Sequence, residues 1–285
     1  MKNGWCGEKV TTSVTPLSPD LTRAVLARLG VASSQPTLDL LDALIAAYTR
    51  SVPWESAFRI AKRARTPDTA DCPRWPDEFW GDALARGGGG TCFESNYAFF
   101  GLLRALGYEG YLTINDMGES IGCHAAIVVW VDGQRWLVDA GLPIYVALRI
   151  DPSRATRRSS PFHAYTVSPD GQGRYQIERT LHPKRNCYTL IDTPVSDAAY
   201  RAATTADYYG AEGFFLDRVI VCKVVDGRAW RFNSAETPLH IESFWEGERV
   251  DQALSGDVAQ AVAGHFGMDV ATVRAALAAS RGRSA

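Results

Sequence analysis

The 285-residue sequence lacks the features that mark a membrane, secreted or nucleic-acid-binding protein. It has no run of about eighteen apolar residues, and its first residues lack the apolar core of a signal peptide. Its 30 basic and 32 acidic residues leave a net charge of -2, so no strong positive field is present. We therefore expect a cytoplasmic protein with neither a nucleic-acid nor a membrane partner.

Cysteine is also scarce. Six cysteines are spread along the chain without a C-x-x-C pair, which is too few for a disulfide framework at this length. We therefore predict that the thiols are reduced. No second pair of candidate ligands accompanies Cys123 and His124 at zinc spacing, so we also predict no metal site. Free cysteine is usually a packing residue, and we interpret Cys123 and Cys222 in this way.

Cys92 has different surroundings. It follows four glycines, Gly87 to Gly90, and the spacing of Thr91 and Glu94 is that of a capping box, so Cys92 is predicted to begin a helix that ends at Gly107. The positive end of a helix dipole stabilises a thiolate, and glycines let a substrate carbonyl approach backbone N–H groups. Cys92 is therefore a candidate nucleophile.

The hydrophobic periodicity changes from helical to strand-like after Gly107, which indicates an antiparallel sheet or barrel in the middle of the chain. The predicted helices cover 22–29, 37–48, 258–266 and 271–279, and 196–209 fits either a helix or a loop. The predicted strands lie around 124–131, 134–139, 162–167, 175–180, 188–190, 219–225, 229–232 and 239–245.

A hairpin offers partners for the thiol. Asp132-Gly133 joins two strand runs, which is a strong signal for a two-residue turn. In that register Ala126 faces Asp139, and His124 lies one diagonal step away, close enough for an imidazole to meet a carboxylate. Taken alone, His124 and Asp139 are interpreted as a strand histidine and a turn-forming aspartate. Together with Cys92 they are interpreted as a base and its orienting group. The other histidines are predicted to be structural or surface residues: His163, His182, His240 and His265.

These residues resemble a known family. Arg86 to Glu94, His124 and Val138 to Gly141 are similar, in order and spacing, to the R-G-G-x-C-x-E, histidine and V-D-V-G-F-G signatures of arylamine N-acetyltransferases. Weaker likeness covers Pro36 to Leu38, Val52 to Glu55 and Phe214 to Phe232.

The resemblance implies an α+β fold of three domains: an N-terminal helical bundle (1–107), a central antiparallel β-barrel (108–195) and a C-terminal α/β lid (196–285). It also implies a papain-like Cys-His-Asp triad. Cys92 would take the acyl group, His124 would be the base, and Asp139 would fix the imidazole tautomer.

The resemblance further implies a ping-pong reaction without a permanently bound cofactor. The co-substrate would be an acyl thioester, either acetyl-CoA or a carrier-protein thioester, and the acceptor a small amine, hydrazine or hydroxylamine. An acyl carrier protein is thus a candidate partner. The backbone N–H of Cys92 is a candidate oxyanion donor.

Several positions depart from the family pattern. Arg86 stands six residues before Cys92 instead of four. The family's P-F-E-N and V-D-V-G-F-G motifs have a tryptophan and a leucine in place of phenylalanine, and its S-P-x-S-x-F segment (210–215) gains a carboxylate that would repel CoA phosphates. The candidate substrate-binding residues are Trp54, Leu142 and Phe215, and no CoA-binding residue is assigned.

Four hypotheses follow. The first is an arylamine N-acetyltransferase; the second is the family's amide synthase branch, which joins a larger acyl chain from a carrier protein to an amine. A thiol hydrolase or amidase would use the same triad with water as acceptor. A binding protein that keeps the fold without catalysis is the fourth.

Overall fold

The computed structural model describes residues 12–180, 182, 184–209, 215–245 and 248–281. The helices are α1 (Pro19–Leu29), α2 (Leu38–Ser51), α3 (Ala57–Arg65), α4 (Pro76–Arg86), α5 (Cys92–Ala105), α6 (Asp197–Ala206), α7 (Val258–Phe266) and α8 (Val270–Arg281), with a short 3-10 helix η1 (Thr69–Asp71). Each predicted helix is present, and the undecided stretch forms α6. Within the described residues, no helix combines the length and apolarity that a membrane span requires.

The strands are β1 (Trp54–Glu55), β2 (Glu109–Met117), β3 (Ser120–Val131), β4 (Gln134–Val138), β5 (Leu148–Ile150), β6 (Thr156–Ser159), β7 (Ala164–Pro169), β8 (Arg174–Arg179), β9 (Asn186–Ile191), β10 (Ile220–Val225), β11 (Arg228–Asn233), β12 (His240–Trp245) and β13 (Glu248–Ala253). They form two antiparallel sheets, ordered β5-β4-β3-β2-β9-β8-β7-β6 and β1-β10-β11-β12-β13. The sequence did not predict β1, β2, β5, β6 or β13.

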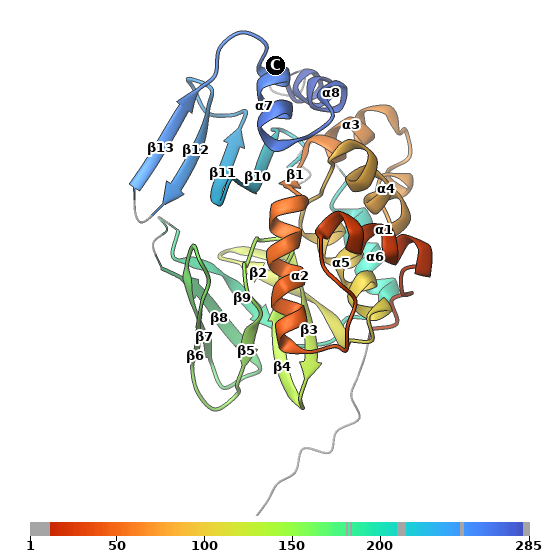
Figure 1. Cartoon of the computed structure of the whole chain (residues 1–285), viewed down its shortest axis with the longest axis vertical. Coiled ribbons are helices and arrows are strands. Elements are labelled where there is room, and N and C mark those ends of the chain that lie inside the picture. The colour runs from red at the N-terminus through yellow and green to blue at the C-terminus, as the bar shows by residue number, and fades with distance from the viewer. Residues whose placement is uncertain (1–11, 181, 183, 210–214, 246–247, 282–285) are drawn as a thin grey trace, which may run out of the picture.

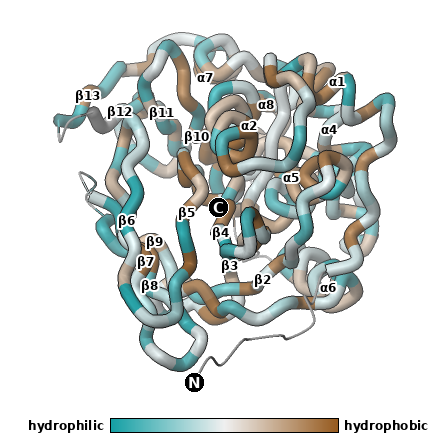
Figure 2. The backbone as a smooth tube through the Cα atoms, turned by 60° about the horizontal axis from the view of Figure 1, so that its bottom comes forward, coloured by the Kyte–Doolittle hydropathy of each residue, from teal (hydrophilic) through white to brown (hydrophobic). Residues whose placement is uncertain are grey.

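The larger sheet curls into a nearly closed barrel. Its two edge strands approach each other, and the Thr156 hydroxyl of β6 donates to the Arg149 carbonyl of β5 at 2.5 Å. In Figure 1 this barrel lies below the smaller sheet, and α1, α2, α4 and α5 lie beside both. The edge strand β6 is drawn mainly in the hydrophilic colour in Figure 2, as expected for an exposed edge. The predicted α+β fold with an antiparallel barrel is confirmed.

The predicted hairpin register is also confirmed. Val131 pairs with Gln134 across a two-residue turn, in which Asp132 (φ 51°) and Gly133 (φ 71°) both have the left-handed conformation that a type I′ turn requires. The pairing continues to Ile127 and Val138, which leaves Asp139 immediately beyond the end of β4. A local turn therefore sets where the carboxylate lies relative to β3.

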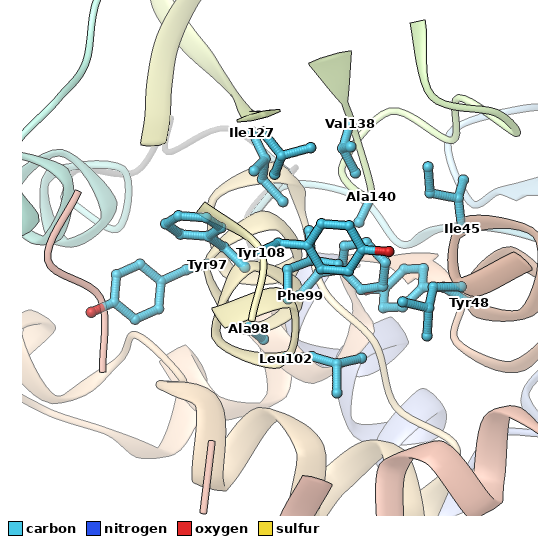
Figure 3. Packing of buried hydrophobic residues seen from close by; sticks show 14 of the residues in the cluster. Ile45, Tyr48, Tyr97, Ala98, Phe99, Leu102, Tyr108, Ile127, Val138 and Ala140 are labelled. Atoms are coloured by element: carbon cyan, nitrogen blue, oxygen red, sulfur yellow. The ribbon is translucent and has the colours of Figure 1, made fainter. Parts of the chain in front are cut away.

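Helix α5 lies at the centre of the largest core. Twelve of its fourteen residues are buried, so it packs on all sides rather than along one stripe. Figure 3 shows Ile127 and Val138 of the β3–β4 hairpin above Phe99 of α5, with Tyr48 of α2 beside it. Burial of each large apolar side chain stabilises the fold by roughly 1.5–3 kcal/mol. The start of α5 is thus held by packing along the whole helix.

The second core does not follow the order of the chain. Helix α3 packs with α7, α8 and the smaller sheet, while α6 returns to α5, where the Tyr200 hydroxyl donates to the Phe93 carbonyl at 2.9 Å. The third core fills the barrel. Helix α3 thus packs with helices from the last part of the chain, while α6 packs with α5 from the first part. The predicted domain boundaries at 107 and 195 stay predictions.

The glycines before α5 allow a close backbone approach. A Cβ atom on Gly89 would lie 1.7 Å from the Pro53 carbonyl oxygen, and one on Gly90 would lie 2.9 Å from the Phe79 ring. Gly81 in α4, by contrast, has no neighbour among the described residues within 4 Å of such an atom. The run thus lets the segment that precedes the thiol pack directly against the connection after α2.

We expect Gly89→Ala to destabilise the protein by about 2–4 kcal/mol, because backbone must move to accommodate the methyl group. Gly81→Ala is the matched control: it should gain roughly 0.5–1 kcal/mol, since alanine is the better residue in an exposed helix interior. Urea denaturation measures both free energies of unfolding. Equal changes in the two variants would contradict the close approach.

Candidate active site

Cys92, His124 and Asp139 lie together, as the sequence predicts. Nε2 of His124 is 2.7 Å from Oδ2 of Asp139, and the Cys92 thiol lies beside the same imidazole, where its Sγ donates to the Cys123 carbonyl at 3.7 Å. Because Asp139 occupies Nε2, Nδ1 is the nitrogen left for the thiol. The three residues are 5%, 2% and 1% exposed, respectively, so the arrangement is almost fully buried.

The electrostatics of the imidazole follow from its neighbours. Burial lowers the pKa of His124, but the Asp139 carboxylate outweighs this effect, and the pKa rises from 6.5 to about 10. The ring is therefore protonated at neutral pH. Tyr188 restricts its orientation, since the two ring centroids are 4.4 Å apart.

Asp139 is itself held by several donors. Its Oδ1 accepts from the backbone N–H groups of Gly141 and Leu142, both at 2.8 Å, and from Nδ2 of Asn96 at 3.1 Å. Oδ1 of Asn96 accepts from the Ala140 N–H at 2.9 Å. The sequence reasoning missed Asn96, although its position four residues after the thiol places it on the same face of a helix.

The loop after Asp139 packs directly on the nucleophile's helix. A Cβ atom on Gly141 would lie 2.4 Å from Cα of Cys92 and 2.6 Å from Nδ2 of Asn96. Only glycine fits this contact, which brings the barrel against the start of α5.

The capping-box prediction is wrong in part. Thr91 is the N-cap of α5, but its buried hydroxyl has no hydrogen-bond partner within the part of the chain that the structure describes. Glu94 accepts instead from Nη2 of Arg74 and the Tyr208 hydroxyl, each at 2.6 Å, and from the Arg74 N–H at 2.9 Å. Hydrogen bonds from a charged group are stronger than the return bond of a capping box.

Arg74, rather than Arg86, supplies the buried guanidinium at this motif. Its side chain is 1% exposed, and Nη2 also donates to the Gly89 carbonyl at 2.6 Å. Arg86 is paired with Asp82, and 36% of its side chain is exposed. Arg86 resembles the family's motif arginine in the sequence, but it is not the residue that contacts Glu94. That contact comes from Arg74, which lies in the connection before α4.

A cavity of about 660 Å³ opens from the thiol between the barrel and the smaller sheet. The predicted residues Trp54, Leu142 and Phe215 all line it, and the Trp54 and Phe215 rings meet edge to face at 4.9 Å between centroids. Other lining residues include Cys123, Tyr145, His163, Arg179, His182, Lys184, Cys187, Cys222 and Trp230. The remainder of the altered segment, 210–214, lies outside the described residues.

Cys123 and Cys222 thus do more than pack, because they contribute to the cavity wall, as do His163 and His182. Burial is the main cause that raises the pKa of the Cys222 thiol to about 11, so this group stays protonated at neutral pH. The sequence pattern placed His163 and Cys222 in strands and gave no sign of the surface that the four residues share.

The cluster Glu236, His240 and Glu242 brings its ligand atoms within 4.8 Å of one another. Guanidinium groups already occupy the acids: Nη1 of Arg231 is 2.8 Å from Glu236 and is also paired with Glu242. The cluster is an ion-pair network of the smaller sheet, and we assign no metal to it.

Comparison with known proteins identifies the family. A model of the N-acetyltransferase family matches residues 37–273, most of the chain. The chain belongs to the N-acetyltransferase family. As a member it is an acyltransferase, and the resemblance seen in the sequence is confirmed.

Individual relatives of this acyltransferase are distant. It is 29% identical to proansamycin X synthase of Amycolatopsis mediterranei (strain S699) over 135 residues, which cover 44% of this chain and half of that protein. Arylamine N-acetyltransferase from Salmonella typhimurium superimposes with a TM-score of 0.76 at 17% identity, over 92% of this chain and 100% of that one. The Mycobacterium marinum enzyme in complex with CoA gives 0.77 at 18%, over 91% and 98%. These structures show the fold.

We expect Arg74→Met to destabilise the protein by about 3–5 kcal/mol, because Glu94 would stay buried without its cation. Arg86→Met is the control and should cost less than about 1 kcal/mol, since that side chain is partly exposed. Chemical denaturation measures the difference. Similar losses in both variants would show that the buried pair has no special weight.

Protonation of His124 predicts a pH dependence of stability. Its folded pKa is above the unfolded value of 6.5, so the stabilisation is complete below pH 6.5 and is lost as the pH rises toward about 10. The free energy of unfolding of the native protein should therefore fall across this range more steeply than that of Asp139→Asn, which removes the cause of the shift. Parallel pH profiles for the two proteins would contradict the assignment.

Proposed function

We propose that this acyltransferase forms amides through an acyl-Cys92 intermediate. The Cys92 sulfur attacks the carbonyl carbon of a thioester, the bond from that carbon to the donor sulfur breaks, and the donor thiol leaves with a proton from His124. An amine then attacks the acyl-cysteine, His124 takes the amine proton, and the amide leaves as the thiolate re-forms. The observation that supports this route is the buried His124–Asp139 pair beside the Cys92 thiol.

The surroundings suit the charge changes of both steps. The protonated imidazole is a proton donor for the departing donor thiol, and Asp139 holds it in one orientation through the Nε2 hydrogen bond. The backbone N–H of Cys92 lies at the N-terminus of α5, where the helix dipole favours a developing oxyanion. Asn96 and Tyr188 are positioning residues, since they act through Asp139 and His124.

The simplest donor is acetyl-CoA, with an arylamine, hydrazine or hydroxylamine as acceptor. The family match and the likeness to a relative that binds CoA support this donor. The thioester is a co-substrate, and the reaction needs no permanently bound cofactor.

A larger acyl group is the second candidate. The cavity of about 660 Å³ lies within the range of pockets that enclose drug-sized molecules, roughly 300–1,000 Å³. It extends past Cys92 to Trp230 of the smaller sheet, well beyond the space that an acetyl group fills. Together with the similarity to proansamycin X synthase, this favours an amide synthase that takes its acyl chain from a carrier protein.

We expect intact-mass spectrometry to detect a covalent acyl adduct when the protein meets a panel of thioesters from acetyl to long aromatic chains. Cys92→Ala should form no adduct, whereas Cys72→Ala, which removes a buried thiol outside the cavity, should still form it. Asp139→Asn should slow acylation by about 10²–10⁴-fold. A preference for long chains over acetyl would select the amide synthase.

The acceptor separates transfer from hydrolysis. A transferase releases its acyl group faster when an amine is added and yields the amide. A hydrolase would release free acid at an unchanged rate with or without amine. Failure of every thioester to load Cys92 would overturn the proposed route.

A further inference from the structure

Arg179 points into the cavity from the barrel wall. It ends β8, and side chains at alternate positions of a strand share a face. Ile177 and Tyr175, two and four residues earlier, are buried in the barrel core, so Arg179 continues the inward-facing row at the end of the barrel that meets the smaller sheet. It is one of the residues that line the cavity.

No acid neutralises this guanidinium within the described residues. Nε of Arg179 donates to the Lys184 carbonyl at 3.2 Å, and no carboxylate of the residues that the structure describes lies within ion-pair distance of it. The arginines on the opposite wall differ. Arg231 is paired with Glu236 and Glu242, and Arg249 with Glu242 and Asp251. The barrel wall therefore carries a guanidinium without an acid partner among the described residues, whereas both arginines of the opposite wall are paired.

The groups around Arg179 leave its positive charge uncompensated. Burial, followed by the charge of Arg179, lowers the pKa of His163 and of His182 to about 4, so both imidazoles are neutral near pH 7. Their rings are 5.7 Å apart, and the ammonium-bearing Lys184 lines the same wall. Nδ1 of His163 is 2.9 Å from the Thr180 carbonyl, which fixes the ring beside Arg179. No residue described at this wall supplies a negative charge.

We propose that Arg179, assisted by Lys184, forms an oxyanion subsite that holds a carboxylate or phosphate group of a substrate. A guanidinium binds such groups through two parallel N–H bonds, which fixes orientation as well as position. The subsite deepens the proposed acyl transfer, on which it rests, by assigning a negatively charged group to one of the two substrates. The group belongs to the thioester donor if it is a phosphate and to the amine acceptor if it is a carboxylate.

The test compares charged and neutral substrates in each half-reaction. Donors are an acyl-CoA and the same acyl group on N-acetylcysteamine, which has no phosphate; acceptors are 4-aminobenzoate and neutral 4-aminobenzamide. We expect Arg179→Gln to raise KM by about 10- to 100-fold for the charged member of one pair, because a hydrogen bond to a charged group is lost. The neutral members should change little, and the affected pair identifies the substrate.

Two variants serve as controls. Arg179→Lys keeps the charge and should recover part of the lost affinity. Arg174→Gln, on the same strand but paired at 2.7 Å with Asp170, should leave both half-reactions unchanged. Equal losses for charged and neutral substrates would indicate a structural role for Arg179, and no change for either pair would also overturn the subsite.

A binding measurement separates this proposal from the reaction route. Calorimetry with CoA and with 4-aminobenzoate reports the subsite even if no thioester loads Cys92. Affinity for one of them that Arg179→Gln weakens supports the subsite independently of catalysis. In the same complex the bound anion should raise the pKa of His163 and His182, visible in their NMR titrations. Equal affinity in native and variant proteins would overturn the subsite while leaving acyl transfer standing.

Discussion

The buried ion pair between Arg74 and Glu94 is the constraint on which the site depends. It joins the connection before α4 to the first turn of α5, and Tyr208 adds a hydrogen bond from the segment after α6. Three distant parts of the chain thus meet at the helix whose first residue is Cys92. A buried charge without its partner is far more costly than the intact pair, so separating these three parts of the chain would strongly destabilise the fold.

The second constraint is the contact between the barrel and α5. Gly141 lies against Cys92 with no room for a side chain, and Asn96 bonds both the Asp139 carboxylate and the backbone after it. The His–Asp pair is therefore placed by the β3–β4 hairpin and aligned on the thiol by α5. Neither element alone would fix the distance between sulfur and imidazole, because they belong to different parts of the fold.

The sequence predicts what local geometry decides. The Asp132-Gly133 turn sets a register, and the register brings His124 to Asp139. The sequence mispredicts the partner of Glu94. A capping box is a local pattern, whereas the Glu94 carboxylate binds a distant guanidinium that holds it more strongly. Arg74 lies in a polar connection without periodicity, so nothing near it in the chain marked it. The cavity walls likewise required the three-dimensional structure.

Charge is compensated differently at the two ends of the cavity. Beside the thiol, Asp139 balances the protonated imidazole within the protein, so the reactive end holds its charges whether or not a substrate is present. On the barrel wall, Arg179 has no such partner among the residues described. A cation left unpaired at a cavity wall is most stable when a ligand brings the anion. Such a ligand would be oriented by its anion at one end while its carbonyl or amine reaches Cys92 at the other.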